Sequence, residues 1–220
     1  MQTKGIIFDM DGLIFDTEAL VYKSSQQAAD SLAMAYDKQT YLRYLGISDE
    51  EFVEKIHADF DEQYGAETIS EFVRRAYANS EAMFSAGLVE LKPGVRELLA
   101  YLDEQGITRI LASSNNRPAI NRLLAQAELA EEFPVVVSAN DVSRAKPDPE
   151  IFLLAAEKLA LPKENLLVLE DSKHGVNAAF AADIPVIMVP DLLGPDDALT
   201  AKTAAVLPDL LAVRDWLKHN

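Results

Sequence analysis

The most informative stretch of the chain is Lys4-Gly5-Ile6-Ile7-Phe8-Asp9-Met10-Asp11-Gly12-Leu13-Ile14-Phe15-Asp16-Thr17-Glu18. Its apolar run, Ile6 to Phe8, predicts a parallel strand that is buried on both faces. Side chains two residues apart on an extended segment point the same way, so Asp9 and Asp11 should project together from the carboxyl end of this strand. Gly12 then permits a sharp turn of the backbone.

Two carboxylates directed into one space repel each other, and a divalent cation bound through oxygen would compensate them. Two other interpretations stay open for this stretch taken alone. Asp and Gly are common turn residues at a strand end. A calcium-binding EF-hand loop also begins with alternating aspartates, although its glycine is the sixth residue and a helix precedes it. Here the glycine is the fourth residue and a strand precedes it, which disfavours the EF-hand.

Composition narrows the functional classes. The 220 residues are 49% hydrophobic and 25% charged, which is ordinary for a soluble globular protein. There is no cysteine, which excludes disulfides and thiolate chemistry. The net charge of −16 disfavours nucleic acid and anionic membranes as partners. No signal-like N-terminal segment and no apolar run of membrane-spanning length is present, so we expect a cytoplasmic protein, and nothing demands more than a monomer.

After Thr17 the apolar side chains follow helical spacing as far as Phe84. Breaks at residues 46–49 and 64–66 divide this segment into several helices. Ser48 followed by Glu51 fits a capping box that would start one of them. These features predict a small helical bundle.

From Pro93 onward strands and helices alternate. We expect helices at 95–105, 118–127, 149–160 and 173–182, and strands at 107–112, 135–137, 166–169 and 185–189. Asp148 is the expected N-cap of the third of these helices. Such alternation predicts an α/β fold: a doubly wound, Rossmann-like parallel sheet with helices on both faces. The first strand belongs to the same sheet, so residues 16–87 form an inserted helical cap, and residues 1–15 and 88–220 form the core.

Ligands of open parallel sheets bind beyond the carboxyl ends of the strands, and several reactive groups follow the predicted strands there. Ser113 to Asn116 follow one strand, Glu170 and Asp171 follow another, and Lys146 lies in the loop between them. Phosphoryl transfer through an acyl phosphate would need this set: a carboxylate to attack phosphorus and a second one to act as acid and base. A cation, a lysine and a hydroxyl would stabilise the transferred group.

Together these residues resemble the four motifs of the haloacid dehalogenase superfamily, and the similarity extends over the whole chain. The matching segments are Asp9-x-Asp11-Gly12, Ser113, Lys146-Pro147 and Glu170-Asp171-Ser172-x-x-Gly175. The subgroup that the chain resembles most is the β-phosphoglucomutase-like phosphatases, which act on small phosphorylated metabolites and use Mg²⁺. Because superfamily dehalogenases lack an acid at the position of Asp11, its presence favours phosphate chemistry.

The resemblance implies a role for each motif residue. It implies that Asp9 is the nucleophile and a Mg²⁺ ligand, and that Asp11 is the general acid/base and binds the metal through its backbone carbonyl. Ser113 would hydrogen-bond the phosphoryl group, and Lys146 would stabilise its charge. Asp171 would be a metal ligand, and Glu170 would bind the metal directly or support it indirectly. Each residue alone has a plainer explanation, such as a helix cap for Ser113 or a solvated charge for Lys146. Their joint appearance in this order favours the functional one.

Further residues are assigned less directly. We place Ser114 and Asn115 near the phosphate. The residues expected to set substrate specificity are Thr17, Arg43, Gly46, Asp49, Asn116 and Arg117.

Three functions compete: a phosphatase of sugar or polyol phosphates, a β-phosphoglucomutase-type isomerase, and a non-enzymatic receiver domain. Mutases of this type carry a histidine and two cations in the cap, where this chain has Val21, Leu45 and Asp49. The mutase is therefore disfavoured, although Arg43 and Arg117 remain as substitutes for those cations. A receiver has no helical insertion after its first strand. We therefore expect a Mg²⁺-dependent phosphatase.

Overall fold

The computed structural model describes residues 3–45, 47 and 49–220. The chain divides into two compact units. One comprises residues Met1–Asp16 and Glu90–Asn220, and the other comprises residues Thr17–Val89. We call the first the α/β unit and the second the helical unit.

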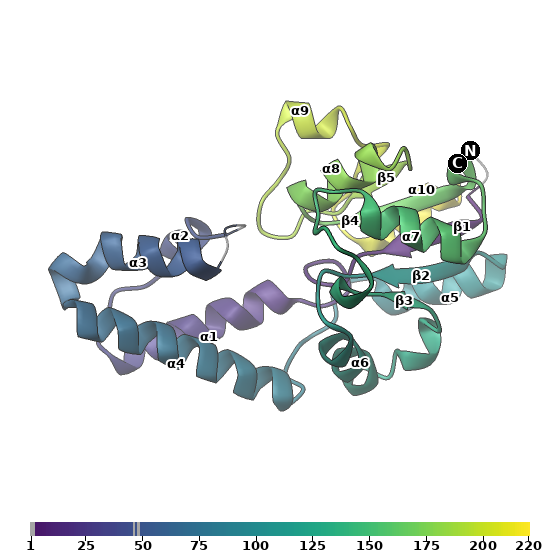
Figure 1. Ribbon diagram of the computed structural model, residues 1–220. Coiled ribbons are helices and arrows are strands. Elements are labelled where there is room, and N and C mark those ends of the chain that lie inside the picture. Colours follow the sequence, from purple (N-terminus) through teal and green to yellow (C-terminus); the bar gives the residue numbers. More distant parts are fainter. Residues whose placement is uncertain (1–2, 46, 48) are drawn as a thin grey trace. The chain divides into compact units, whose positions relative to one another are not determined.

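A six-stranded parallel sheet is the centre of the α/β unit (Figure 1). Its strands are β1 (Gly5–Phe8), β2 (Thr108–Ala112), β3 (Val136–Val137), β4 (Leu166–Glu170), β5 (Val186–Met188) and β6 (Ala205–Val206). Their order in the sheet is β3-β2-β1-β4-β5-β6. This arrangement confirms the predicted α/β fold with a doubly wound parallel sheet.

Strand β1 lies in the middle of the sheet, and its four residues are buried. Phe8, its last residue, is in register with Leu111 of β2 and Leu169 of β4. The residues that follow these three strands therefore emerge at the same edge of the sheet.

Helices cover both faces of the sheet. They are α5 (Val95–Gln105), α6 (Arg117–Gln126), α7 (Glu150–Leu159), α8 (Lys173–Ala181), α9 (Asp197–Thr200) and α10 (Leu210–Leu217), with short 3₁₀ turns at Ala130–Glu132, Ala139–Asp141 and Lys163–Asn165. On one face, Phe152 of α7 and Val176 of α8 pack on Ile7, Ile110 and Val168. Helices α5 and α10 pack against each other on the opposite face (Figure 1).

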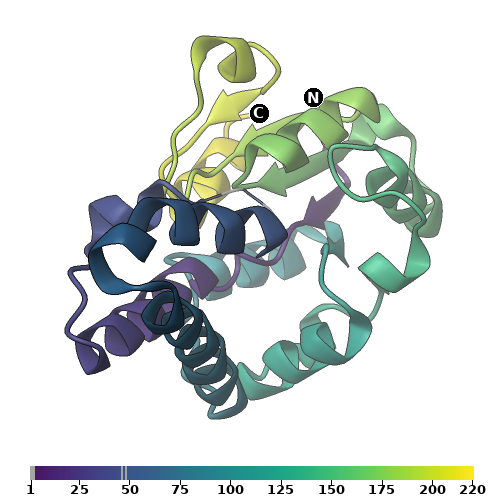
Figure 2. The same cartoon turned by 60° about the vertical axis from the view of Figure 1, so that its left-hand side comes forward.

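The helical unit consists of α1 (Thr17–Ser31), α2 (Lys38–Leu42), α3 (Asp49–Tyr64) and α4 (Ala66–Ser85). Helices α1 and α4 lie side by side, and α3 also packs on α4 (Figures 1 and 2). Gly65, with φ of +85°, connects α3 to α4 at the break that the sequence indicates. The expected cap residue Ser48 lies outside the described residues.

Several element ends differ by one residue from the sequence-based expectation, and two of these differences lie near the residues of the predicted site. Helix α7 begins at Glu150 with Pro149 as its N-cap, so the assignment of the cap to Asp148 is wrong. The Asp148 carboxylate still accepts a hydrogen bond from the Glu150 N–H, at 3.0 Å, and thus satisfies a free donor of the first turn. Strand β4 continues through Glu170, one residue further than expected, because Glu170 is paired with Met188 of β5.

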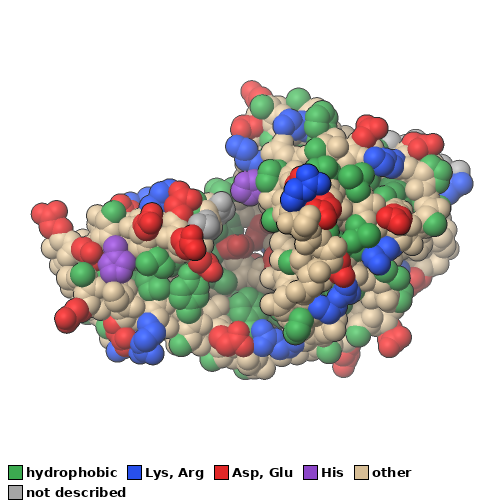
Figure 3. Space-filling model, viewed as in Figure 1, with side chains coloured by type: hydrophobic (Ala, Val, Ile, Leu, Met, Phe, Trp, Pro, Cys, Tyr) green, Lys and Arg blue, Asp and Glu red, His purple; other side chains and the backbone are tan. Residues whose placement is uncertain are grey.

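The surface is polar and acidic. Figure 3 shows Asp and Glu side chains spread over the visible face of both units. Among the helices in the described part of the chain, none combines the length and apolar character needed to cross a bilayer.

Candidate active site

Asp9 follows β1 directly and is 7% exposed. Its backbone N–H donates to the Leu169 carbonyl at 3.0 Å, which continues the pairing of β1 with β4. The loop after it closes on itself: the N–H groups of Ile14 and Phe15 donate to the Met10 carbonyl at 2.9 and 3.1 Å. This tight loop holds Asp9 in one place at the sheet edge.

Lys146 joins the loops that follow different strands. Its Nζ donates to Asp9 Oδ1 at 2.5 Å, to Glu170 Oε1 at 2.6 Å and to the Ala112 carbonyl at 3.3 Å. The side chains of Lys146, Asp9 and Glu170 are only 6%, 10% and 1% exposed. The ammonium also lies 4.8 Å from the centre of the Phe152 ring. The three charges therefore form a buried, mutually paired cluster.

Burial alters the proton affinities in this cluster. Desolvation raises the pKa of the Asp9 carboxyl from 3.8 to about 7, against the opposing charge of Lys146. Desolvation alone would lower the pKa of Lys146, but the carboxylates of Asp9 and Glu170 hold it above its ordinary value. Lys146 therefore stays cationic across the physiological range.

Glu170 has both carboxylate oxygens engaged. Oε1 accepts from Lys146, and Oε2 accepts from the N–H groups of Asp171 and Ser172 at 3.1 Å and from Ser172 Oγ at 3.0 Å. The carboxylate lies so close to Gly175 that a Cβ there would come within 1.8 Å of it. Glu170 therefore acts as a fixed anchor for Lys146 and for the start of α8.

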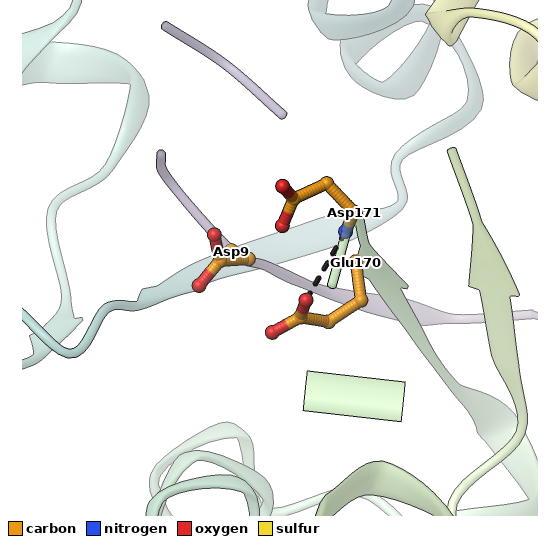
Figure 4. A group of neighbouring side chains, drawn as sticks. All are labelled: Asp9, Glu170 and Asp171. Carbon is orange, nitrogen blue, oxygen red and sulfur yellow. Dashed lines mark hydrogen bonds between the residues drawn. The ribbon is translucent and has the colours of Figure 1, made fainter. Parts of the chain in front are cut away.

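Asp9, Glu170 and Asp171 direct their carboxylates toward a common region (Figure 4). One oxygen from each lies within 4.8 Å of the others. Desolvation and the nearby Glu170 charge raise the pKa of Asp171 well above its usual 3.8. Gly12, with φ of +72°, gives Asp171 room, since a Cβ at this position would lie 2.2 Å from Asp171 Oδ2. These carboxylates offer hard oxygen donors, and Lys146 offsets their mutual repulsion only in part. Such a group of oxygens suits a Mg²⁺ ion.

Asp11 and the loop after β2 are also joined. Asn115 Nδ2 donates to Asp11 Oδ2 at 2.7 Å, and the Asn115 N–H donates to Ser113 Oγ at 3.1 Å. Ser113 is fully buried. Ser114 and Lys146 also line a cavity of about 180 Å³ in the α/β unit. The structure thus brings together Asp9, Asp11, Lys146, Glu170 and Asp171, and Asn115 contacts both Asp11 and Ser113.

Two expected specificity residues have structural contacts of their own in the α/β unit. Asn116 is the N-cap of α6 and accepts from the Ala119 N–H at 3.0 Å. The Arg117 guanidinium donates to the Val136 carbonyl at 2.9 Å and to Asp141 at 2.5 Å. Its charge is therefore already paired.

The other expected specificity residues belong to the helical unit. Thr17 is buried at the start of α1, and Asp49 begins α3. Arg43 pairs with Asp59 at 3.7 Å. Gly46 lies outside the described residues.

The sequence analysis missed Lys92 and Asp191. Lys92 Nζ donates to Asp191 Oδ1 at 2.7 Å and lies 3.9 Å from Asp16. The Asp191 side chain is 6% exposed, its charge contributes to the raised pKa of Asp171, and its Oδ2 has no hydrogen-bond partner among the described residues. Asp191 lies three residues after β5, so a search for reactive residues beyond the carboxyl ends of all strands could have found it.

Comparisons with known proteins agree with this geometry. Residues 6–189 match the model of the haloacid dehalogenase-like hydrolase family. A phosphorylated carbohydrates phosphatase from Thermotoga maritima is 35% identical, with 82% of each chain covered. Beta-phosphoglucomutase from Bacillus subtilis is 31% identical, covering 99% of this chain and 97% of its own. The crystal structure of a candidate beta-phosphoglucomutase from Thermotoga maritima superposes with a TM-score of 0.82 at 30% identity over 99% of both chains. The chain therefore belongs to the haloacid dehalogenase-like hydrolases, among the β-phosphoglucomutase-like phosphatases.

Proposed function

We propose that the protein is a Mg²⁺-dependent phosphatase of small phosphorylated carbohydrates that acts through an aspartyl-phosphate intermediate. The observation that carries this proposal is the buried cluster in which Lys146 bonds both Asp9 and Glu170, with Asp171 beside them. It combines a carboxylate at a strand end with a permanent cation next to it. The carbohydrate class is supported by the relative that is named for this activity.

In the first step an Asp9 carboxylate oxygen attacks phosphorus, and the bond from phosphorus to the leaving alcohol breaks. Protonated Asp11 gives its proton to the leaving oxygen. In the second step Asp11 takes a proton from water, whose oxygen attacks phosphorus and breaks the bond to Asp9. Inorganic phosphate leaves, and both aspartates return to their initial states. The hydrogen bond from Asn115 to Asp11 holds the acid/base in position for both steps.

Other residues stabilise and select the substrate. Lys146 neutralises charge shared by Asp9 and the phosphoryl group, and Ser113, Ser114 and Asn115 bind its oxygens. Asp9, Asp171 and the backbone carbonyl of Asp11 would hold Mg²⁺, which when bound supplies further charge neutralisation. Because both oxygens of Glu170 are engaged by protein donors, we assign Glu170 to the support of this site. The helical insertion at 16–87 would provide substrate specificity.

The proposal is tested by phosphate release from sugar and polyol phosphates, with and without Mg²⁺. Asp9→Asn should lower kcat by about 10⁴-fold or more, because it removes the attacking oxyanion. Asp183→Asn, an exposed change away from the site, should leave the rate unchanged. Acid-quenched Asp11→Asn protein should carry a phosphoryl adduct in its mass spectrum. Phosphate release that survives in Asp9→Asn would contradict the mechanism.

A mutase is the second candidate, and the names of two similar proteins favour it. It would return the phosphoryl group of Asp9 to a bound sugar instead of to water. Incubation with β-glucose 1-phosphate and the corresponding bisphosphate distinguishes the two. Free phosphate supports the phosphatase, and glucose 6-phosphate supports the mutase.

A further inference from the structure

Asp191 has a buried carboxylate of which only one oxygen is in use. Its Oδ1 accepts a hydrogen bond from Lys92 Nζ at 2.7 Å. Its Oδ2 is also buried and has no hydrogen-bond partner among the described residues. The side chain is only 6% exposed, so it is shielded from bulk water. A buried acceptor without a donor is costly, and an acceptor in this state points to a donor that arrives with a ligand.

The loop after β5 places Asp191 beside Asp171, a proposed metal ligand. Val189, two residues before Asp191, donates its N–H to the Glu170 carbonyl at 2.8 Å, which extends the pairing of β5 with β4. A Cβ on Gly12 would lie 3.3 Å from Asp191 Cβ and 2.2 Å from Asp171 Oδ2, so the two side chains approach the same point over Gly12. The charge of Asp191 also contributes to the raised pKa of Asp171. Asp191 therefore borders the proposed metal site.

Lys92 determines which oxygen of Asp191 stays in use. The Lys92 N–H donates to the Ile14 carbonyl at 2.8 Å, so its backbone is tied to the loop that follows Asp9. Its side chain is 19% exposed, and its ammonium holds Oδ1 of Asp191. With Oδ1 held by a cation, Oδ2 is the oxygen that can accept a hydrogen bond from a ligand.

Asp191 would reach the metal through a water molecule. Among the described residues, the carboxylates whose oxygens converge are those of Asp9, Glu170 and Asp171, and Asp191 is not one of them. Mg²⁺ dehydrates reluctantly and keeps several of its waters when it binds to a protein. One such water would supply the donor that Oδ2 lacks, in a hydrogen bond that the carboxylate strengthens. Partners of this kind outside the direct ligands tune metal affinity.

We propose that Asp191 is a positioning residue of the metal site, whose Oδ2 accepts a hydrogen bond from a water of the bound Mg²⁺ while Lys92 holds its Oδ1. The proposal rests on the Mg²⁺ site of the proposed function and adds a residue outside the four motifs. It implies a preference for Mg²⁺ over Ca²⁺. Ca²⁺ accepts more ligands in a more flexible geometry, so it depends less on one oriented water.

Two double variants separate this hydrogen bond from the effect of charge: Lys92→Met with Asp191→Asn, and Lys92→Met with Asp191→Leu. Both remove the same two charges, and Asn and Leu are similar in size, but only Asn keeps an oxygen that can accept. Lys92 has to be removed as well, because its ammonium would hold the amide oxygen of Asp191→Asn and turn the NH₂ group toward the water.

Calorimetric titration with Mg²⁺ and with Ca²⁺ measures the dissociation constants. For Mg²⁺, we expect the Asn double variant to stay within about threefold of the native protein and the Leu double variant to bind at least about tenfold more weakly. For Ca²⁺, the two double variants should differ by less than about threefold. Thermal melting without metal checks that both variants fold.

Equal Mg²⁺ dissociation constants of the two double variants would overturn the inference, and so would an equal loss of Mg²⁺ and Ca²⁺ affinity in the Leu variant. If the Leu variant does not fold, Asp191→Asn decides: a loss confined to Mg²⁺ supports the inference, and equal losses for both ions overturn it. Asp9-dependent phosphate release would stand in either case. The expected affinities in a protein that releases no phosphate would contradict the proposed function alone, and a native protein that binds no Mg²⁺ would contradict both.

Discussion

The sheet-edge site and a cavity of about 260 Å³ in the helical unit, lined by Tyr36, Tyr41, Tyr44 and Tyr77, bury polar groups in opposite ways. At the sheet edge, Lys146 is held between two carboxylates, and each of these three charges has a partner of opposite sign. In the cavity, neutral tyrosine hydroxyls face carboxylates, and one buried hydroxyl has no partner among the described residues. The first arrangement suits a group that every substrate shares, the phosphoryl dianion. The second leaves a buried hydroxyl donor available among aromatic rings.

The strongest test of this contrast is the removal of the buried cation. Lys146→Met should lower the free energy of unfolding by about 3–5 kcal/mol, because it leaves the carboxylates of Asp9 and Glu170 buried without compensation. Urea denaturation measures the effect. Lys55→Met, which removes a cation that is 49% exposed, is the control and should change stability by less than about 1 kcal/mol. Equal losses of unfolding free energy in the two variants would show that burial of Lys146 with Asp9 and Glu170 does not make its charge more important for stability than an exposed one.

The raised pKa values at the sheet edge predict a pH dependence. The folded protein retains a proton on Asp9 up to a pKa of about 7, whereas the unfolded chain releases it near 3.8. The folded state thus binds more protons, so this group makes the metal-free protein less stable as pH rises from about 4 to about 7. The difference in stability between the native protein and Asp9→Asn isolates the effect.

The stabilisation that Mg²⁺ provides should increase as pH rises, because the ion binds the ionised carboxylates. We expect Mg²⁺ to raise the melting temperature more at pH 8 than at pH 5. A shift of the same size at both pH values would contradict the assignment of the raised carboxyl pKa values to the metal ligands.

A smaller effect is expected from the pair of Lys92 and Asp191. Asp191→Asn removes a negative charge that acts on Asp171 and leaves the Lys92 ammonium with the longer contact to Asp16, at 3.9 Å, which should weaken Mg²⁺ binding about tenfold. Lys92→Met removes that ammonium and should not weaken it. Calorimetric titration with Mg²⁺ compares the two variants. Equal Mg²⁺ affinities of the two variants would show that the pair of Lys92 and Asp191 does not influence the metal site.

The smallest effect on stability should come from Arg43. Its ion pair with Asp59 joins side chains that are 54% and 43% exposed, so Arg43→Ala should change the free energy of unfolding by less than about 1 kcal/mol. We expect Arg43→Ala and Asp49→Ala to change the relative rates among substrates while Mg²⁺ binding persists. Unchanged relative rates across the panel would contradict a role of these residues in specificity.

Much of the fold follows from local patterns. The run Ile6 to Phe8 predicts the central strand, and the alternation after Pro93 predicts the parallel sheet. Helix α5 begins and ends where the sequence indicates, at Val95 and Gln105. Element ends near proline are less predictable, as α7 shows, because the cap is decided by backbone geometry that residue preferences only bias.

The candidate site could be predicted where reactive residues end a strand or directly follow one. Asp9, Ser113 and Glu170 are recognised because parallel strands present their carboxyl ends at one edge of the sheet. The environment of the cap residues could not be predicted in this way. The sequence analysis singles out neither Tyr36 nor Tyr44, because whether a tyrosine hydroxyl is buried and finds a partner depends on residues that pack on it from elsewhere in the chain.

The sequence by itself determined the order of strands and helices, the insertion after the first strand, and the residue types at the strand ends, since all of these depend on neighbours along the chain. Only the tertiary structure decided the pairs that act at a distance. Lys146 meets Asp9 across 137 positions, and Lys92 meets Asp191 across 99. Whether a charge is buried, paired or left without a partner depends on what packs around it, and residues far away in the chain supply that packing.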